Sequence, residues 1–414
     1  MANHKSWISK KNIVYFVYAI SVFLLGGYCF FRWETYNVKI ISNLAYILYY
    51  AGAILMVCYV LSHCKKIRYS SFFIMPYAFL LTMYVAFAGT KYRALTYGDI
   101  ELLLIIFVIC QMSEKNEAQL FEYVAKIFAI LVLPSLIYFI LSNLGINIPY
   151  DIQMPEHTLK SAYGIYYKHY PFGLVMIQNG WISRYCGIFD EAGFVGTLCG
   201  FFIAACHNRM DKKWVILLLI EGIFSLSLAF YLLLVIYAIV YAWSKGFVRV
   251  AGTILALALG LLLFVNIDFH NESIAHIQSR IDLTSTILVE DNRSNDTTDA
   301  EIKGFLNEGN IDVLIGKGRG ASSKNANISG WSYKFLLYDY GIIGIVLYIG
   351  FFIFYAWKRG RFNKSTFPFI AVFIASIYQR PYVFSKLNIT IFMLGISYIT
   401  YSRYRISFHK NVSD

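Results

Sequence analysis

The chain contains 414 residues, of which 58% are hydrophobic, 18% are aromatic and only 14% are charged. Soluble domains usually carry about a quarter charged residues, so this chain has too few to cover a water-facing surface. The composition excludes a cytosolic enzyme, a secreted disulfide-rich scaffold and a disordered protein. It predicts a single all-α polytopic membrane domain over residues 1–414. We therefore interpret the net charge of +12 as a signal of membrane topology and expect no nucleic-acid partner.

Apolar segments recur along the whole chain, and each is a candidate transmembrane helix, which needs about 20 residues. The first follows a basic N-terminal segment and has no small-residue cleavage site, so we predict a retained span. Several segments are short, which favours tilted or re-entrant helices. The twelve predicted spans are 13–31, 41–62, 71–89, 97–112, 121–142, 188–207, 213–227, 229–244, 250–266, 332–356, 367–380 and 388–402.

The stretch 213–244 is apolar without a break. One helix of this length would rise about 48 Å, whereas the hydrocarbon core is about 30 Å thick. We therefore predict two short helices that turn near residues 225–227.

The distribution of basic residues supports this division. With a cytoplasmic N-terminus, most Lys and Arg side chains fall in the inner segments, and the positive-inside rule then predicts that both termini are cytoplasmic. These basic inner segments are 1–12, 64–68, 113–116, 208–213, 245–249, 358–364 and 403–414. The short outer loops hold Arg32, Lys39, Lys91, Arg93, Arg380 and Lys386.

Two long segments then lie on the outer face, at 143–187 and 266–330. Within the second, 270–282 and 298–308 are predicted to form short amphipathic helices. The seven cysteines are scattered, without a CxxC pair or a Cys/His cluster of metal-site spacing, so we predict neither disulfides nor a bound metal.

The first outer loop carries many aromatic side chains, among them Trp181 and Tyr185. Flat amphipathic rings beside hydroxyl and amide groups are suited to holding sugar rings. The alternative is an interfacial aromatic belt, because Trp and Tyr gather at the level of the lipid headgroups in any case.

At the end of this loop, the sequence SRYCGIFDEAGFVG places Arg184, Asp190 and Glu191 at the outer mouth of the sixth predicted span. A carboxylate there could accept a proton from a sugar hydroxyl, and Arg184 could bind a phosphate through two nitrogens. The alternative is ordinary helix-start chemistry, in which Asp190 is an N-cap, Glu191 lies in the first turn and Arg184 anchors the interface.

The second outer loop contains Arg280, then Asp291 and Arg293, then GKGRG with Lys317 and Arg319. The glycine-rich turn predicts a backbone nest with two cations, which suits an anion. It is not a P-loop, because no Lys-Ser or Lys-Thr pair follows in register. The alternative is a flexible loop that leads into the next span.

Ionisable side chains inside predicted spans are few, and Glu221 and Asp339 are the main ones. Buried intramembrane carboxylates are costly and therefore candidates for function, although each could also make a structural contact between helices. Arg380, before Pro381, is predicted at an outer helix end, where it faces the same pocket or extends to the interface. Charge is therefore densest at the outer face and the span mouths, which suits work on a lipid-anchored substrate.

Four sequences between about residues 180 and 350 carry a resemblance to a known family. In order they are RYCGIFDEAGFVGT, FSLSLAFYLLL, GKGRG after a long outer loop, and WSYKFLLYDYGIIGIVLY. Together they resemble the Wzy-type O-antigen and capsular polysaccharide polymerases. Arg293 and Gly304, with ten residues between them, look like the arginine–glycine spacing of some members, whereas Arg184 and Gly196 have eleven between them.

This resemblance implies a glycosyltransferase in the bacterial inner membrane that joins undecaprenyl-pyrophosphate-linked repeat units on the outer face, with no cofactor. It also implies membrane lipids, a chain-length regulator and a flippase as partners. The alternatives are an O-antigen ligase, which usually has a His where this chain has NANISGWSY, and a flippase or other transporter. The expected roles are Glu191 as the base, Asp190 and Asp291 as rival bases, and Arg184 and Arg293 on the pyrophosphate. Further substrate-binding candidates are Lys317, Arg280, Arg319, Arg380, Trp181 and Tyr185.

Overall fold

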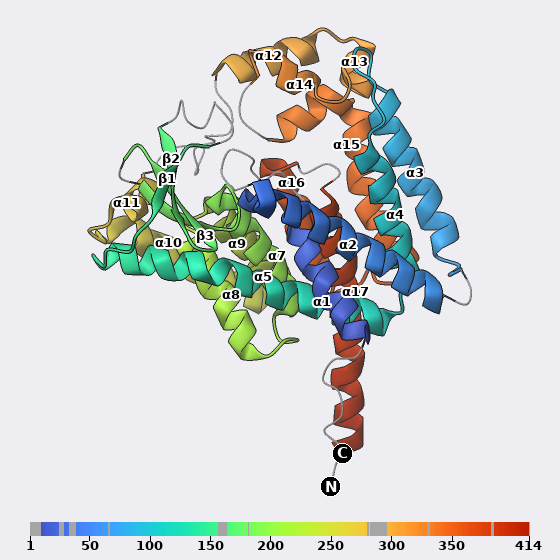
Figure 1. The fold of residues 1–414 in the computed structure, drawn as a ribbon, viewed down its shortest axis with the longest axis horizontal. Coiled ribbons are helices and arrows are strands. Elements are labelled where there is room, and N and C mark those ends of the chain that lie inside the picture. Colours follow the sequence, from blue (N-terminus) through green and yellow to red (C-terminus); the bar gives the residue numbers. More distant parts are fainter. Residues whose placement is uncertain are drawn as a thin grey trace.

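The computed structural model describes residues 10–24, 29–32, 39–64, 67–155, 164–180, 182–279, 281, 296–328, 332–381 and 385–413. The protein is mostly helical (Figure 1). We call the end that carries α12–α14, drawn at the top of Figure 1, the upper end, and the end where α17 projects downward the lower end. The helices of the first half are α1 (Lys10–Phe23), η1 (Phe30–Arg32), α2 (Lys39–His63), α3 (Ser71–Phe87), α4 (Tyr97–Gln111) and α5 (Glu114–Asn143).

The second half continues with the helices α7 to α17. They are α7 (Ala192–Cys206), α8 (Lys212–Phe224), α9 (Leu228–Trp243), α10 (Phe247–Asn266), α11 (Glu272–Gln278), α12 (Asp296–Asn307), α13 (Ile311–Ile315), α14 (Ala321–Lys324), α15 (Tyr333–Lys358), α16 (Phe367–Gln379) and α17 (Lys386–Ser413).

A helix overlaps each of the twelve predicted spans, although α1 ends at Phe23 whereas the first span was predicted to reach residue 31. Among the described residues, four helical segments are long and apolar enough to cross a membrane: Ser42–His63, Glu114–Asn143, Phe247–Asn266 and Tyr333–Lys358. Other apolar helices, such as α7 and α9, are shorter. The chain therefore has the helices of a membrane protein, while twelve crossings remain a prediction.

The predicted break within 213–244 is confirmed, because α8 ends at Phe224 and α9 begins at Leu228. Leu226 in the turn has a left-handed backbone, with φ 49°. The two helices approach closely at Gly222, where a Cβ atom would lie 2.1 Å from Cε2 of Phe230. Glycine at this position therefore lets the chain fold back on itself.

The first outer loop, expected without strands, instead forms an antiparallel sheet. Its strands are β1 (Asp151–Gln153), β2 (Ile165–Tyr170), β3 (Gly173–Gln178) and β4 (Ile182–Gly187), in the order β1-β2-β3-β4. Asn179 and Gly180 both have positive φ in the turn before β4, which is the pattern that an Asn-Gly hairpin favours. The all-α prediction is therefore wrong for this segment, and Tyr166 and Tyr167 belong to a strand instead of a loop.

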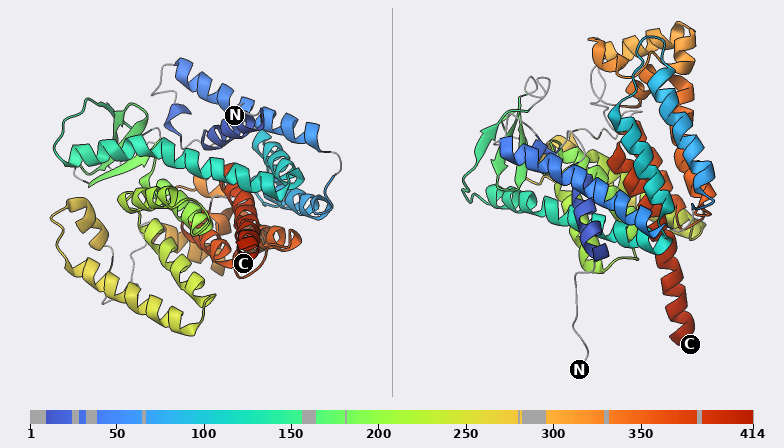
Figure 2. Two further views of the ribbon diagram at one scale, coloured as in Figure 1. Left: turned by 90° about the horizontal axis from the view of Figure 1, so that it is seen from below. Right: turned by 45° about the vertical axis from the view of Figure 1, so that its right-hand side comes forward.

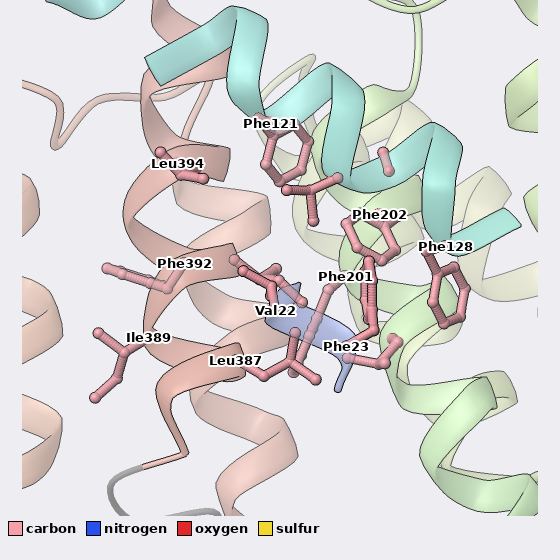
Figure 3. Close-up of a cluster of buried hydrophobic side chains, with 14 of the residues drawn as sticks. Val22, Phe23, Phe121, Phe128, Phe201, Phe202, Leu387, Ile389, Phe392 and Leu394 are labelled. Carbon is pink, nitrogen blue, oxygen red and sulfur yellow. The ribbon is translucent and has the colours of Figure 1, made fainter. Parts of the chain in front are cut away.

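The sheet packs on α5, the long helix that crosses the molecule (Figures 1 and 2). The Ser135 hydroxyl of α5 donates a hydrogen bond of 2.6 Å to the carbonyl of Leu174 in β3. The aromatic core continues from α5 to α7 and α17, and Figure 3 shows the rings of Phe121, Phe128 and Phe202 side by side. This core joins α5, on which the sheet packs, to α7 and α17.

The second outer loop contains the two predicted short helices, at α11 and α12. With α13 and α14, α12 forms a small cap over the first turns of α15. A break at Gly341, with φ 64°, separates these turns from the rest of α15. Carboxylates and cations thus meet where α4, α7, α15, α16 and α17 begin or end.

Candidate functional site at the upper ends of the helices

Arg380 and Glu191 form a two-pronged ion pair between α16 and α7. Nη1 of Arg380 lies 2.7 Å from Oε2 of Glu191, and Nη2 lies 2.5 Å from Oε1. The Arg380 side chain is 3% exposed, whereas that of Glu191 is 31% exposed. This geometry is the strong form of an arginine–carboxylate contact, and it holds a buried cation beside an accessible carboxylate.

The local backbone explains how the two side chains meet. Glu191 is the N-cap of α7 and not a residue of its first turn, and Arg380 is the C-cap of α16. A Cβ atom on Gly193 would lie 2.2 Å from Nη2 of Arg380. Any other residue at 193 would therefore displace the guanidinium from the carboxylate.

Asp190, the rival base, is 4% exposed and lies one residue before the N-cap. Its backbone carbonyl accepts a hydrogen bond of 2.7 Å from the Tyr167 hydroxyl, which ties β2 to the start of α7. Because Glu191 is the more exposed of the two carboxylates, it is the better placed to meet a ligand.

Arg184 and Tyr185 are neighbours on β4 and therefore point to opposite faces of the sheet. Nη2 of Arg184 donates to Oε1 of Gln178 at 3.2 Å, at a half-buried position. Tyr185 is fully buried, and its hydroxyl donates to the backbone carbonyl of Glu221. Tyr185 therefore lies in the interior, away from any sugar at the surface, and we leave it out of the site.

The GKGRG turn was expected to hold an external anion, but it holds one from the chain itself. The carboxylate of Asp339 accepts the backbone N–H of Gly320 at 3.0 Å and that of Ser322 at 2.7 Å. The N–H of Gly318 donates to the Asp339 carbonyl at 2.8 Å. Asp339 on α15 thus occupies the nest, which explains the intramembrane carboxylate and leaves these amides unavailable to a ligand.

The two cations of the turn also have partners within the chain. Arg319 makes hydrogen bonds of 2.6 and 2.5 Å to the two carboxylate oxygens of Asp99 on α4, and these bonds raise the pKa of Arg319. Lys317 is buried against the rings of Phe305 and Tyr338. Burial alone would lower the pKa of Lys317, but the Tyr338 hydroxyl and nearby carboxylates outweigh it, so the pKa is raised. Both cations attach the cap of α12–α14 to the helices.

Four of the predicted site residues, Trp181, Arg280, Asp291 and Arg293, lie outside the described residues. Sequence reasoning also overlooked an ion pair at the upper end between Lys386 at the start of α17 and Glu101 in α4. The signal for it was present, because Glu101 is a charged residue near the start of an apolar helix. Within the described part of the chain, no group of three or more His, Cys, Asp or Glu side chains is arranged to hold a metal ion.

Comparisons with known protein families, with curated proteins and with solved structures find no match to this chain.

Proposed function

We propose that this chain is a bacterial inner-membrane glycosyltransferase that joins undecaprenyl-pyrophosphate-linked oligosaccharide repeat units on the outer face. In this proposal the upper end is the outer end, the twelve apolar helices lie in the membrane and both termini are cytoplasmic. The product is O-antigen or capsular polysaccharide, and the flippase and chain-length regulator of the same pathway are partners. Its support is the resemblance in sequence together with the geometry of the upper end.

The observation that carries the proposal is the contact between Arg380 and Glu191, a nearly buried cation beside a carboxylate that is one third exposed. A site of this kind can exchange partners. When a diphosphate approaches, its oxygens replace those of Glu191 on the guanidinium, which matches phosphate geometry equally well. Glu191 then loses its cation and becomes a stronger base at the moment when a base is needed.

Glu191 and Arg380 together account for the proton and the negative charge that move in the glycosyl transfer. The acceptor hydroxyl oxygen forms a bond to the anomeric carbon of the donor glycan, and the bond from that carbon to the diphosphate oxygen breaks. Glu191 takes the hydroxyl proton, and the lipid diphosphate leaves as an anion whose charge Arg380 stabilises. Arg184 on β4 is the cation that precedes Glu191 most closely in the sequence.

The test uses the purified full-length protein with lipid-linked repeat units extracted from the host strain. We expect Glu191→Gln and Arg380→Ala each to lower polymer formation at least 100-fold, since general bases contribute about 10²–10⁴-fold in rate. Glu122→Gln is the matched control, because it removes a carboxylate from the ion pair of Glu122 with Lys126 on α5. Polymer formation at the wild-type rate by Glu191→Gln would refute the site.

A positioning variant separates this site from a general loss of folding. Gly193→Ala should push Arg380 away from Glu191 while both side chains remain. We expect polymerisation to fall with little change in the amount of folded protein. If the chain were a transporter instead, purified protein in detergent would make no polymer, and wild type and variants would be equally inactive.

A further inference from the structure

The sheet has two turns at opposite ends of its strands, and the turns differ in polarity. Pro171 and Phe172 join β2 to β3, whereas Asn179 and Gly180 follow β3 on the way to β4. Because β3 has six residues, the two turns lie about 20 Å apart. The β2–β3 hairpin therefore has an apolar end and a polar end.

Phe172 occupies its turn at a conformational cost. Its φ is 61°, in the left-handed region that bulky side chains rarely adopt, whereas the other turn has Asn179 at a φ of 54°, a residue that accepts this conformation. Phe172 is also 68% exposed. A strained backbone that presents an apolar ring outward calls for an apolar partner outside the chain.

The apolar end of the hairpin lies against α5. The Ser135 hydroxyl donates its hydrogen bond to the carbonyl of Leu174, two residues after Phe172, and Ser135 comes well before α5 ends at Asn143. Figure 1 shows the strands rising from this helix. α5 is long and apolar enough to cross a membrane, and Ile130 on its surface is 54% exposed. Lipid acyl chains are therefore the apolar partner that the turn and the exposed surface of α5 can share.

The side chains along the hairpin follow the polarity of a lipid leaflet. Lys168 on β2 lies between the two ends, and its Nζ is 4.8 Å from the centre of the Tyr150 ring. Lysine and tyrosine side chains gather at the level of the lipid headgroups. β2 and β3 pair in register along their whole length, so the backbone near the apolar turn is hydrogen-bonded, as a hydrocarbon environment requires. From one end to the other, the hairpin thus presents an aromatic ring, a cation beside a phenol, and a polar turn.

We propose that the β2–β3 turn is a wedge that inserts into the outer leaflet of the membrane, with the Phe172 ring among lipid acyl chains beside α5. Lys168 and Tyr150 then lie at the headgroups, and the turn at Asn179 lies in water. The word outer rests on the proposed function, but insertion of the turn into a leaflet stands by itself. The sheet is thus seated in the surface of the bilayer and does not project from it as a soluble domain.

Contacts within the chain connect the wedge to the candidate site. The ring of Phe172 lies 6.5 Å from that of Phe31, which lies 4.1 Å from that of Phe30. The backbone N–H of Phe30 donates to the carbonyl of Ile188 at 3.0 Å, shortly before Glu191 in the chain. The depth of the wedge therefore sets the height of Glu191 relative to the headgroups, where the diphosphate of a lipid-linked substrate lies.

The experiment measures the depth of a nitroxide label in the purified full-length protein, reconstituted in nanodiscs of phosphatidylcholine and phosphatidylglycerol. Cys58 and Cys64 are first replaced by serine, because the other five cysteines are buried and shielded from the labelling reagent. Collisions with oxygen and with a water-soluble nickel chelate then give the depth of a label at Phe172→Cys. We expect it about 5–10 Å below the phosphates, the depth of interfacial apolar side chains. Ile130→Cys is the acyl-chain control, and Lys303→Cys, at an exposed position of α12, is the water control.

A label at residue 172 that the nickel chelate reaches as readily as a label at residue 303 overturns the inference. So does a label shielded from both reagents, which would show that protein covers the turn. Phe172→Trp keeps an aromatic ring and gives a second measurement in case the labelled protein folds poorly. Its added fluorescence should be quenched by phospholipids brominated on the acyl chain, and quenching by aqueous iodide instead contradicts the wedge.

The wedge and the polymerisation fail separately, because the depth of the label is measured without any substrate. A protein that makes no polymer but holds residue 172 among acyl chains refutes polymerisation alone. A protein that polymerises with residue 172 in water refutes the wedge alone.

Discussion

Two arginine–carboxylate contacts, Glu117 with Arg359 and Arg361 at the lower end and Glu191 with Arg380 at the upper end, differ in burial. At the lower end, Glu117 of α5 is fully buried and receives Arg359, Arg361 and the hydroxyl of Ser397. Arg361 is only 1% exposed. At the upper end, the carboxylate that receives Arg380 is one third exposed.

The difference teaches which contact is structural and which is available for chemistry. The two oxygens of Glu117 are enclosed by side chains from α17 and from the turn after α15, so an incoming ligand has no approach. Such a contact fixes helix positions and is expensive to break. The upper contact leaves about a third of the Glu191 side chain exposed, so a ligand can reach it and exchange partners without unfolding the chain.

The largest expected effect comes from breaking the lower contact. Glu117→Gln leaves Arg359 and Arg361 buried without their main counter-charge, and loss of one partner of a buried ion pair costs about 3–5 kcal/mol. We expect a large fall in the unfolding temperature of the detergent-purified protein, measured by calorimetry. Glu122→Gln, in a partly exposed pair on the same helix, is the control and should be nearly neutral. Equal stability of both variants would show that the lower contact is dispensable.

An intermediate effect is expected for Arg319 and Asp99, which are 21% and 2% exposed. A double-mutant cycle with Arg319→Gln and Asp99→Asn should give a coupling free energy of about 0.5–3 kcal/mol, the range for residues in direct contact. Limited proteolysis of the chain between α12 and α14 should accelerate in the single variants, because this pair attaches the cap to α4. Additive effects in the cycle would mean that the pair does not stabilise the cap.

The sequence predicted the helices well, because runs of apolar residues leave few alternatives to a helix in a membrane. The break at residues 225–227 followed from the length of the apolar stretch and the distribution of basic residues, and it is confirmed. The sheet at 151–187 was missed, although Asn179-Gly180 is a hairpin signal. Its aromatic residues were interpreted as a sugar-binding surface or as an interfacial aromatic belt. The strands show no simple alternation of buried and exposed positions that would have revealed them, because β3 is buried along most of its length.

The sequence identified individual residues of the candidate site but did not predict which of them would pair. Glu191 and Arg380 were each singled out, but 189 residues separate them, and no periodicity relates residues so far apart. The nest at GKGRG was recognised from its glycines, yet its occupant, Asp339, comes from another helix. Local patterns therefore identify which residues can carry chemistry, whereas their partners depend on helix packing.

The smallest expected effect is a pH dependence that arises at His169 in the sheet. Burial lowers the pKa of His169 on β2 below its ordinary value of 6.5, against a smaller opposing influence of Asp151. The unfolded chain therefore binds more protons than the folded one between the lowered pKa and 6.5, and stability is lost as the pH falls through that window. We expect the unfolding temperature to be level above pH 6.5 and to decline below it, with a shallower decline in His169→Gln. His270→Gln, at an exposed position, serves as the control. If His169→Gln declined as steeply as the wild type, the acid sensitivity would arise outside the sheet.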